Sequence, residues 1–188
     1  SRPVIHSTRQ DKGFRTVSTN GTSALNTVVI TGASTGIGRA CTLHMDGLGF
    51  RVFAGIRKAE DGEELQEIAS TRLRPIYLDV TNGESIGVAA DTIKDVCGTR
   101  GLSGLVNNAG IVIAGPLEFL PLDSLRAQLE INVVGQIAVT QALLALLRCA
   151  RGRIVNMSSV SGRVAAPLLG PYAASKFALE ALSDSMRL

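Results

Sequence analysis

A short β-branched run that ends in a glycine-rich turn constrains the fold of this chain more than any other feature. The run covers residues 27–31 (TVVIT), and the turn follows at once as Gly32, Ala33, Ser34, Thr35, Gly36, Ile37 and Gly38. Apolar residues then recur at helical spacing up to Leu48, and Gly49 is typical of a helix end. A buried strand, a tight turn and a helix in this order predict the first unit of an α/β fold with a parallel sheet.

The rest of the chain repeats the alternation of strand and helix. Strands are predicted over residues 51–56, 74–80, 102–106 and 153–157, and helices over 37–48, 61–69, 84–97, 122–150 and 172–188. This order predicts a doubly wound, Rossmann-like parallel sheet with helices on both faces. The 188 residues suffice for one such domain, over residues 27–188, and residues 1–26 are predicted to be a flexible tail.

Composition and charge exclude several classes of protein. Hydrophobic residues make up 45% of the chain and charged residues 19%, which argues against disorder. The net charge of +3 is spread along the sequence and aromatic residues make up only 4%, so no nucleic-acid partner is expected. The best candidate for a membrane span, residues 137–150, is interrupted by Thr140, Gln141 and Arg148, and we expect no span.

The cysteines indicate a reducing compartment. Cys41, Cys97 and Cys149 lie far apart, none belongs to a C-x-x-C motif, and their number is odd. This usage is typical of buried free thiols, so we expect a cytoplasmic protein without a metal site.

The glycine turn has the arrangement of a phosphate-binding site. Gly32 permits a sharp exit from the strand, Gly36 lets a pyrophosphate approach the backbone, and Gly38 lets the helix pack close to the sheet. The start of the helix offers free N–H groups and the positive end of the helix dipole. No lysine follows the second glycine, which disfavours a phosphate-hydrolysing loop. A tight turn without a ligand is the alternative interpretation.

The end of the second predicted strand bears on the choice of dinucleotide. An acidic residue about 20 positions after the glycine turn often holds the adenosine ribose. Here Gly55 and Ile56 are followed by Arg57 and Lys58, which favour a 2′-phosphate and hence NADP over NAD. Glu60 and Asp61 lie close by and keep NAD open, and a solvated loop end is the alternative interpretation of the two cations.

Tyr172 and Lys176 are four residues apart on a predicted helix and therefore lie on one face of it. A free tyrosine has a pKa of about 10, too high for a good base at neutral pH. A neighbouring ammonium group stabilises the phenolate and lowers that value, so the pair is a candidate for proton transfer. Because the Y-x-x-x-K spacing alone is mostly chance, this interpretation depends on the neighbouring motifs.

Serine and asparagine side chains add two further candidates. Ser158 and Ser159 follow the fifth predicted strand, where a hydroxyl can hydrogen-bond a substrate carbonyl or simply cap the loop. Asn132 interrupts an apolar helical stripe, and a buried asparagine needs partners. Asn132 either relays protons through water or repairs a distorted helical turn.

These motifs together resemble those of the short-chain dehydrogenase/reductase family. The matching residues are Thr31-Gly32-Ala33-Ser34-Thr35-Gly36-Ile37-Gly38, Asn107-Asn108-Ala109-Gly110, Asn132, Ser159 and Tyr172-Ala173-Ala174-Ser175-Lys176. The resemblance covers about residues 27–188, with the motifs in the order and at the spacing of the family. Ser159 precedes Tyr172 by 13 positions, which is the family interval and favours Ser159 over Ser158.

The resemblance implies a role for each residue of a catalytic set. Tyr172 is the implied general acid and base, and Lys176 is implied to hold the nicotinamide ribose and to support Tyr172. Ser159 is implied to orient and polarise the substrate oxygen, and Asn132 to support a water in a proton relay. Asp79 is implied to accept a hydrogen bond from the adenine amino group.

The resemblance also implies a cofactor site, with Asn107 stabilising the sheet beside it. The site consists of Gly32, Ser34, Thr35, Gly36, Ile37, Gly38, Arg57, Lys58, Asp79, Val80, Asn108, Ala109, Gly110, Tyr172 and Lys176. The stretch 55–58 is similar to the branch of the family that handles steroids, retinoids and other apolar alcohols. Family members continue with further strands and a substrate-covering segment, so we expect the C-terminal strands of the fold to be missing here.

The loops beside the catalytic positions indicate the class of substrate. Their apolar residues are Ile111, Val112, Ile113, Leu117, Phe119, Val160, Val164, Leu168 and Leu169, and Arg163 is the one cation among them. This composition predicts an apolar ketone, aldehyde or secondary alcohol, although core packing accounts for about half of these residues. The long helix at 122–150 has more apolar surface than one sheet face can cover, which predicts a homodimer or homotetramer.

Three functions therefore remain open from the sequence. The first is an NADP-dependent oxidoreductase that uses Tyr172 as general acid and base. The second is a dinucleotide-binding sensor or scaffold without catalysis, which the intact Tyr172 and Lys176 pair argues against. The third is an epimerase or dehydratase on a related fold that uses the same cofactor transiently.

Overall fold

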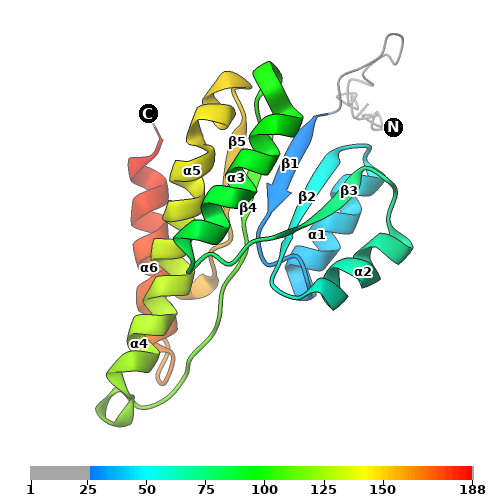
Figure 1. The fold of residues 1–188 in the computed structure, drawn as a ribbon. Coiled ribbons are helices and arrows are strands. Elements are labelled where there is room, and N and C mark those ends of the chain that lie inside the picture. Colours follow the sequence, from blue (N-terminus) through cyan, green and yellow to red (C-terminus); the bar gives the residue numbers. More distant parts are fainter. Residues whose placement is uncertain (1–25, 188) are drawn as a thin grey trace, which may run out of the picture.

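A computed structural model describes residues 26–187, and its centre is a parallel sheet (Figure 1). The predicted tail over residues 1–26 lies outside the described residues, apart from Asn26. The strands are β1 (Thr27–Ile30), β2 (Arg51–Ile56), β3 (Leu73–Tyr77), β4 (Gly104–Asn107) and β5 (Arg153–Asn156). They pair in the order β3-β2-β1-β4-β5, and every pair is parallel.

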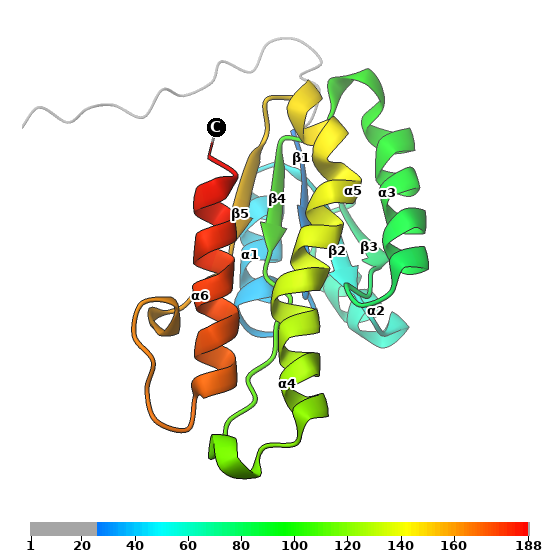
Figure 2. The same ribbon diagram turned by 90° about the vertical axis from the view of Figure 1, so that its left-hand side faces the viewer.

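Helices cover both faces of this sheet. They are α1 (Gly36–Gly47), α2 (Ala59–Ile68), α3 (Gly83–Cys97), α4 (Leu122–Leu129), α5 (Gly135–Cys149) and α6 (Gly170–Ser185). Helices α1 and α2 lie on one face, and α3, α5 and α6 lie on the other (Figures 1 and 2). The predicted α/β fold class is thereby confirmed.

The central strand β1 divides the core into two layers. Val29 faces α3 and α5 in one apolar cluster, whereas Val28 and Ile30 face α1 and α2 in the other. Because successive side chains of a strand point to opposite faces, a strand covered on both sides must be apolar throughout. This is why residues 27–31 form an unbroken β-branched run.

Two strand boundaries differ from the prediction by more than one residue. The third strand was expected to run to Val80, but its pairing with β2 ends at Tyr77. Beyond that point Asp79 forms a turn, in which its Oδ1 accepts hydrogen bonds from the N–H and the hydroxyl of Thr81. The fourth strand begins at Gly104 rather than Leu102, because the N–H of Leu102 donates to Leu146 in α5 instead of to a strand.

The prediction of a single helix over residues 122–150 is wrong in one respect. A π-helical turn, Glu130–Val134, separates α4 from α5, and Asn132 lies in it.

By length and composition the stretch Leu122–Cys149 is apolar enough to cross a membrane, against our expectation that no such segment exists. That evidence is weak, because a helix packed in a protein core passes the same test, and α5 packs on α3 and β4.

The carboxyl ends of the central strands lie together, and this is what positions the site. Strand order reverses between β1 and β4, and ligands of open α/β sheets bind at such a reversal. The end of β1 is tied to β4 by the N–H of Thr31, which donates to Val106. The end of β4 is tied to β5 by the N–H of Met157, which donates to Asn107.

Candidate active site

A cavity of about 810 Å³ lies at the carboxyl ends of the strands, next to the reversal of strand order. Its lining includes Gly32, Ser34, Thr35, Ile37, Arg57, Lys58, Asp79, Val80, Asn108, Ala109 and Gly110, all of which the sequence had indicated as cofactor-binding. Gly55, Ile56, Asp61, Tyr77, Leu78, Ile111 and Ile131 complete it. The other predicted members, Gly36, Gly38, Tyr172 and Lys176, are not part of the lining.

The glycine turn forms one wall of the cavity. Gly32 has a φ of +63°, and a Cβ added there would lie 2.8 Å from the Cα of Ala109. A Cβ on Gly38 would collide with the carbonyl oxygen of Gly32 and with the side chain of Asn108. Gly38 therefore lets α1 start directly against the turn and against Asn108, although Gly38 itself does not line the cavity.

Asn108 and Thr31 hold this wall together. The side-chain Nδ2 of Asn108 donates to the carbonyl oxygens of Thr31 and Gly32, each at 3.0 Å. The hydroxyl of Thr31 in turn accepts from the N–H groups of Asn108 and Ala109, each at 3.0 Å. Two motifs far apart in the sequence thus become one rigid rim, because each satisfies the backbone polar groups of the other.

The chemistry of this cavity fits a dinucleotide. The start of α1 borders it, where backbone N–H groups point outward and the helix dipole favours an anion. Arg57 and Lys58 are exposed at its rim. Its volume is within the range usual for cofactor pockets. Gly32, Ser34, Thr35 and Ile37 line this part of the cavity and are the residues that could hold a phosphate group.

Asp79 lines the cavity just after the end of β3. The backbone and side-chain hydrogen bonds from Thr81 lower the pKa of its carboxyl, and the charge of Arg57 lowers it further. Asp79 is therefore an anion that can accept a hydrogen bond. Tyr77 and Leu78, which also line this part, had no motif that singled them out in the sequence.

Lys176 is the buried cation of the candidate site. Only 4% of it is exposed, and its Nζ donates to the carbonyl oxygen of Met157 at 2.6 Å. Burial lowers the pKa of its ammonium group. Its Nζ lies 5.6 Å from the centre of the Tyr172 ring, so the two side chains do share one face of α6.

Ser159 follows β5 and precedes a short 3₁₀ turn, Val160–Gly162, that packs on α6. Its hydroxyl oxygen accepts a hydrogen bond from the N–H of Ser161 at 3.1 Å. The capping role left open by the sequence is therefore present. The hydrogen bond from Ser161 uses a lone pair of the Ser159 oxygen and leaves the hydroxyl proton free, so Ser159 can still donate a hydrogen bond to a ligand.

Asn132 connects the cavity wall to α6. Its Oδ1 accepts from the N–H of Ile111 at 2.8 Å, and its Nδ2 donates to the carbonyl of Ile111 at 2.9 Å and to Ser175 at 3.1 Å. Ser175, which sequence reasoning passed over, donates to the carbonyl of Tyr172 at 2.7 Å. One side chain therefore links the segment that lines the cavity to the turn of helix that carries Tyr172.

Asn107 and Asn156 join the carboxyl ends of β4 and β5. The fully buried Nδ2 of Asn107 donates to Thr140 at 2.9 Å and to Asn156 at 2.8 Å. Asn156 donates to Ser183 in α6 at 2.8 Å. Asn107 thus ties the sheet to α5 and, through Asn156, to α6.

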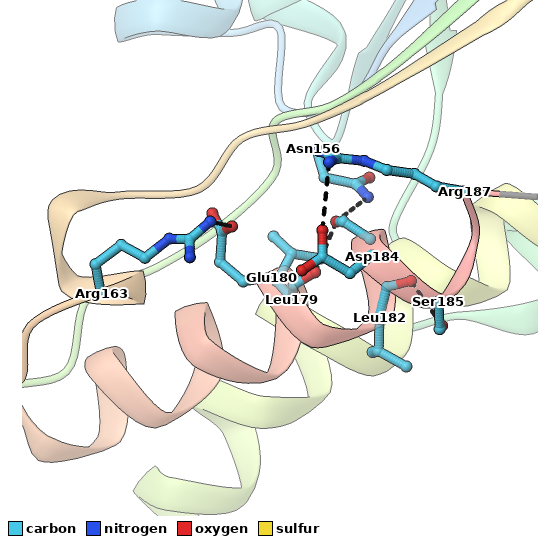
Figure 3. Close-up of polar contacts among 9 residues, drawn as sticks. Asn156, Arg163, Leu179, Glu180, Leu182, Asp184, Ser185 and Arg187 are labelled. Atoms are coloured by element: carbon cyan, nitrogen blue, oxygen red, sulfur yellow. Dashed lines mark hydrogen bonds and ion pairs between the residues drawn. The ribbon is translucent and has the colours of Figure 1, made fainter.

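Arg163, the cation beside the catalytic positions, has a partner. Its Nη2 lies 3.0 Å from Oε2 of Glu180, and the two side chains point toward one another from the loop and from α6 (Figure 3). The neighbouring Ser158 hydroxyl and then Arg163 lower the pKa of Glu180, so Glu180 is an anion at neutral pH. The pair is neutral as a whole.

Comparison with known proteins gives consistent results. The family model described as short chain dehydrogenase matches residues 26–188. Retinol dehydrogenase 5 of Mus musculus is 47% identical over 161 residues, which are 85% of this chain and 50% of that protein. Mitochondrial D-beta-hydroxybutyrate dehydrogenase of Mus musculus is 40% identical over 166 residues, covering 85% of this chain and 48% of that protein.

Solved structures give the same picture. The crystal structure of a short-chain dehydrogenase from Streptomyces avermitilis aligns with a TM-score of 0.81 and 34% identity, over 88% of this chain and 61% of the other. The chain spans about half the length of the curated relatives that it matches. The similarity to the retinoid-handling branch expected from the sequence is confirmed.

Proposed function

Because the chain belongs to the short-chain dehydrogenase family, we propose that it carries the cofactor site and the proton-transfer group of an NADP-dependent oxidoreductase. The reaction is the interconversion of an apolar secondary alcohol with its ketone, or of a primary alcohol with its aldehyde. The observation that carries the proposal is the buried Lys176 beside Tyr172, at the strand ends that border a cavity suited to a dinucleotide.

The nicotinamide cofactor, when bound, supplies or accepts a hydride. Gly32, Ser34, Thr35 and Ile37 hold its phosphates at the start of α1, and Asp79 holds its adenine. Gly110 and Ile111 form part of the cavity wall beside this site.

Tyr172 handles the proton. Its phenolic oxygen donates to the substrate oxygen during reduction and receives the proton during oxidation. The Lys176 ammonium stabilises the phenolate formed in that step, because a charge held in a buried site interacts strongly with its neighbour. Ser159 donates its hydroxyl proton to the same substrate oxygen and so orients it.

The choice of NADP rests on the charges at the rim. Arg57 and Lys58 line the cavity and are exposed. Both cations are therefore accessible to the 2′-phosphate of an incoming NADP. Asp61 also lines the cavity and opposes the preference. Arg57, Lys58 and Asp61 together carry a net charge of +1, which favours the additional negative charge of a 2′-phosphate.

The proposed substrate is apolar. Val112, Leu117, Val160, Val164 and Leu168 are exposed on the loops beside the catalytic positions. Arg163, which could otherwise attract a carboxylate, is paired with Glu180. These features favour an apolar alcohol such as retinol, which the name of one relative gives, over a carboxylic acid such as hydroxybutyrate, which the name of the other gives.

We also carry forward two proposals about assembly and location. A homodimer or homotetramer would cover exposed residues of α5 and its π turn, among which Val134 is 51% exposed. A cytoplasmic location is the second proposal. Light scattering of the purified protein and fractionation of expressing cells test the two separately.

The decisive experiment compares wild type with Tyr172→Phe in the protein as it is expressed. We expect NADPH-linked reduction of a panel of apolar ketones and aldehydes by wild type, and a loss of about 10²- to 10⁴-fold in kcat for Tyr172→Phe with unchanged NADPH affinity. Undiminished turnover in the variant refutes the role of Tyr172. Tight NADPH binding by wild type without any turnover supports the sensor instead.

A further inference from the structure

Three amide side chains are buried at intervals of four residues along α4, the π turn and α5. Gln128, Asn132 and Gln136 each have 0% of their surface exposed, and we call this set the amide ladder. Gln128 is the only fully buried residue of α4, which is described along its whole length. An amphipathic helix normally places an apolar side chain there, and a buried amide is costly unless its polar atoms are bonded.

The amide ladder bonds the backbone of alternate residues in one extended segment. Gln136 donates to the carbonyl of Ala109 at 2.9 Å, and Asn132 bonds both the N–H and the carbonyl of Ile111. Gln128 donates to the carbonyl of Ile111 and accepts from the N–H of Ile113, both at 2.6 Å.

The repeat distances of helix and segment explain why this pattern works. Two residues of extended chain advance about 6.6 Å, and four residues of α-helix advance about 6 Å. A spacing of four drifts by about 40° per step around an α-helix, since each residue turns about 100°. The π turn at Glu130–Val134 contains more residues per turn and offsets this drift. The ladder therefore replaces a neighbouring strand, with side-chain amides in place of backbone amides.

The bonded segment is also a wall of the proposed cofactor site. Ala109, Gly110 and Ile111 line the cavity, whereas Gln128 does not. We infer that Gln128 is a positioning residue, which acts through the backbone of Ile111 and Ile113 to hold this wall in shape for NADP. This inference rests on the proposed function and extends it to a residue outside the cavity.

The first experiment removes the amide and keeps the shape. Gln128→Met retains an unbranched side chain of similar length, and Gln141→Met makes the same change at an exposed position of α5 as a control. Hydrogen exchange is followed for the segment 109–113, and NADPH affinity is measured at a temperature where all proteins are folded. For Gln128→Met we expect exchange in the segment to rise more than in β1, and the Kd for NADPH to rise about tenfold or more.

The second experiment distinguishes positioning from mere filling of space. In Gln128→Glu, a neutral carboxyl can accept from Ile113 and donate to Ile111 as the amide does, whereas a carboxylate can only accept. The affinity of the variant for NADPH, divided by that of wild type at the same pH, should therefore fall as pH rises. A Gln128→Met protein that fails to fold leaves this comparison intact.

The outcomes separate this inference from the proposed function. Unchanged exchange in Gln128→Met together with a pH-independent ratio in Gln128→Glu overturns the inference. Wild type that binds NADPH while Gln128→Met binds it equally well also overturns it, and leaves the proposed function standing. Wild type that binds no NADPH overturns the proposed function, and with it the cofactor part of the inference. Faster exchange in the segment would then support only a structural role for the ladder.

Discussion

The Nζ of Lys176 in α6 donates a hydrogen bond of 2.6 Å to the carbonyl oxygen of Met157, the residue directly after β5. No carboxylate lies within ion-pair distance of this ammonium group among residues 26–187. A buried cation with a carbonyl as its acceptor costs stability, which makes Lys176 a candidate for a functional role.

The first prediction concerns the dependence of stability on pH. Burial lowers the pKa of Lys176, so between its folded value and the unfolded value of about 10.4 the unfolded chain binds more protons. The contribution of Lys176 to the free energy of unfolding therefore increases as the pH rises from its folded pKa to its unfolded pKa. Lys176→Met lacks the group, so the stability of wild type relative to Lys176→Met should increase with pH. Urea titrations at a series of alkaline pH values measure it, and a constant difference contradicts the prediction.

The second prediction concerns the glycine turn. In Gly38→Ala the new methyl group collides with Gly32 and Asn108, so the turn must open. We expect a lower Tm and a rise of about tenfold or more in the Kd for NADPH. Gly87→Ala is the matched control, because nothing lies within 4 Å of a Cβ there and the residue is exposed in α3. It should stabilise the protein by about 0.5–1 kcal/mol and leave binding unchanged. Equal effects of both substitutions would contradict the proposed role of the glycine turn in NADPH binding.

The third prediction concerns cofactor preference. The double variant Arg57→Gln, Lys58→Gln removes the cations at the rim and should weaken NADPH binding about 10- to 100-fold. NADH, which lacks the 2′-phosphate, should lose far less. Asp61→Asn should act in the opposite direction and strengthen NADPH binding. Fluorescence titration with both nucleotides measures these effects.

The control for this prediction removes the same charge elsewhere. The control variant carries Lys94→Gln and Arg100→Gln. Lys94 lies in the last turn of α3 and Arg100 in the short turn after it, and neither lines the cavity. This variant should leave the ratio of NADPH to NADH affinity unchanged. A wild-type protein that prefers NADH would show that Asp61 dominates the rim.

The fourth prediction concerns the joint between strands. Asn107→Leu leaves Asn156 and Thr140 without their buried donor, and should lower the free energy of unfolding by about 2–3 kcal/mol. Ser103→Ala removes a hydrogen bond to Asn26 that is exposed, and should change stability by less than about 0.5 kcal/mol. Urea unfolding at neutral pH compares the two variants, and similar losses would refute the importance of burial.

Local patterns explain which predictions from the sequence succeeded. The β-branched run and the glycines that follow it predict a strand and a tight turn, because backbone conformation depends mainly on neighbouring residues. The spacing of Tyr172 and Lys176 predicts a shared helix face by the same logic. Boundaries were less accurate, as at Tyr77, because turn formation by Asp79 and Thr81 competes with strand pairing.

The partner of a polar side chain could not be predicted in this way. Arg163 looked free in the sequence, and Glu180 lies 17 residues away from it on α6. Asn132 had two open interpretations, and the structure places it in a π turn and bonds it to Ile111 and Ser175. The role of a proton relay through water stays a prediction.

By itself, the sequence determined the alternation of strands and helices, the glycine turn and the placement of Tyr172 and Lys176 on one helix face. Each follows from the periodicity of a short segment, which the chain carries wherever that segment lies in space. Only the tertiary structure decided how Gln128 and Asn132 bond the cavity wall, how Lys176 reaches Met157, and how Asn107 joins two strands to α5. Those contacts join segments distant in the chain, and a buried polar group takes whichever partner the packing brings within reach.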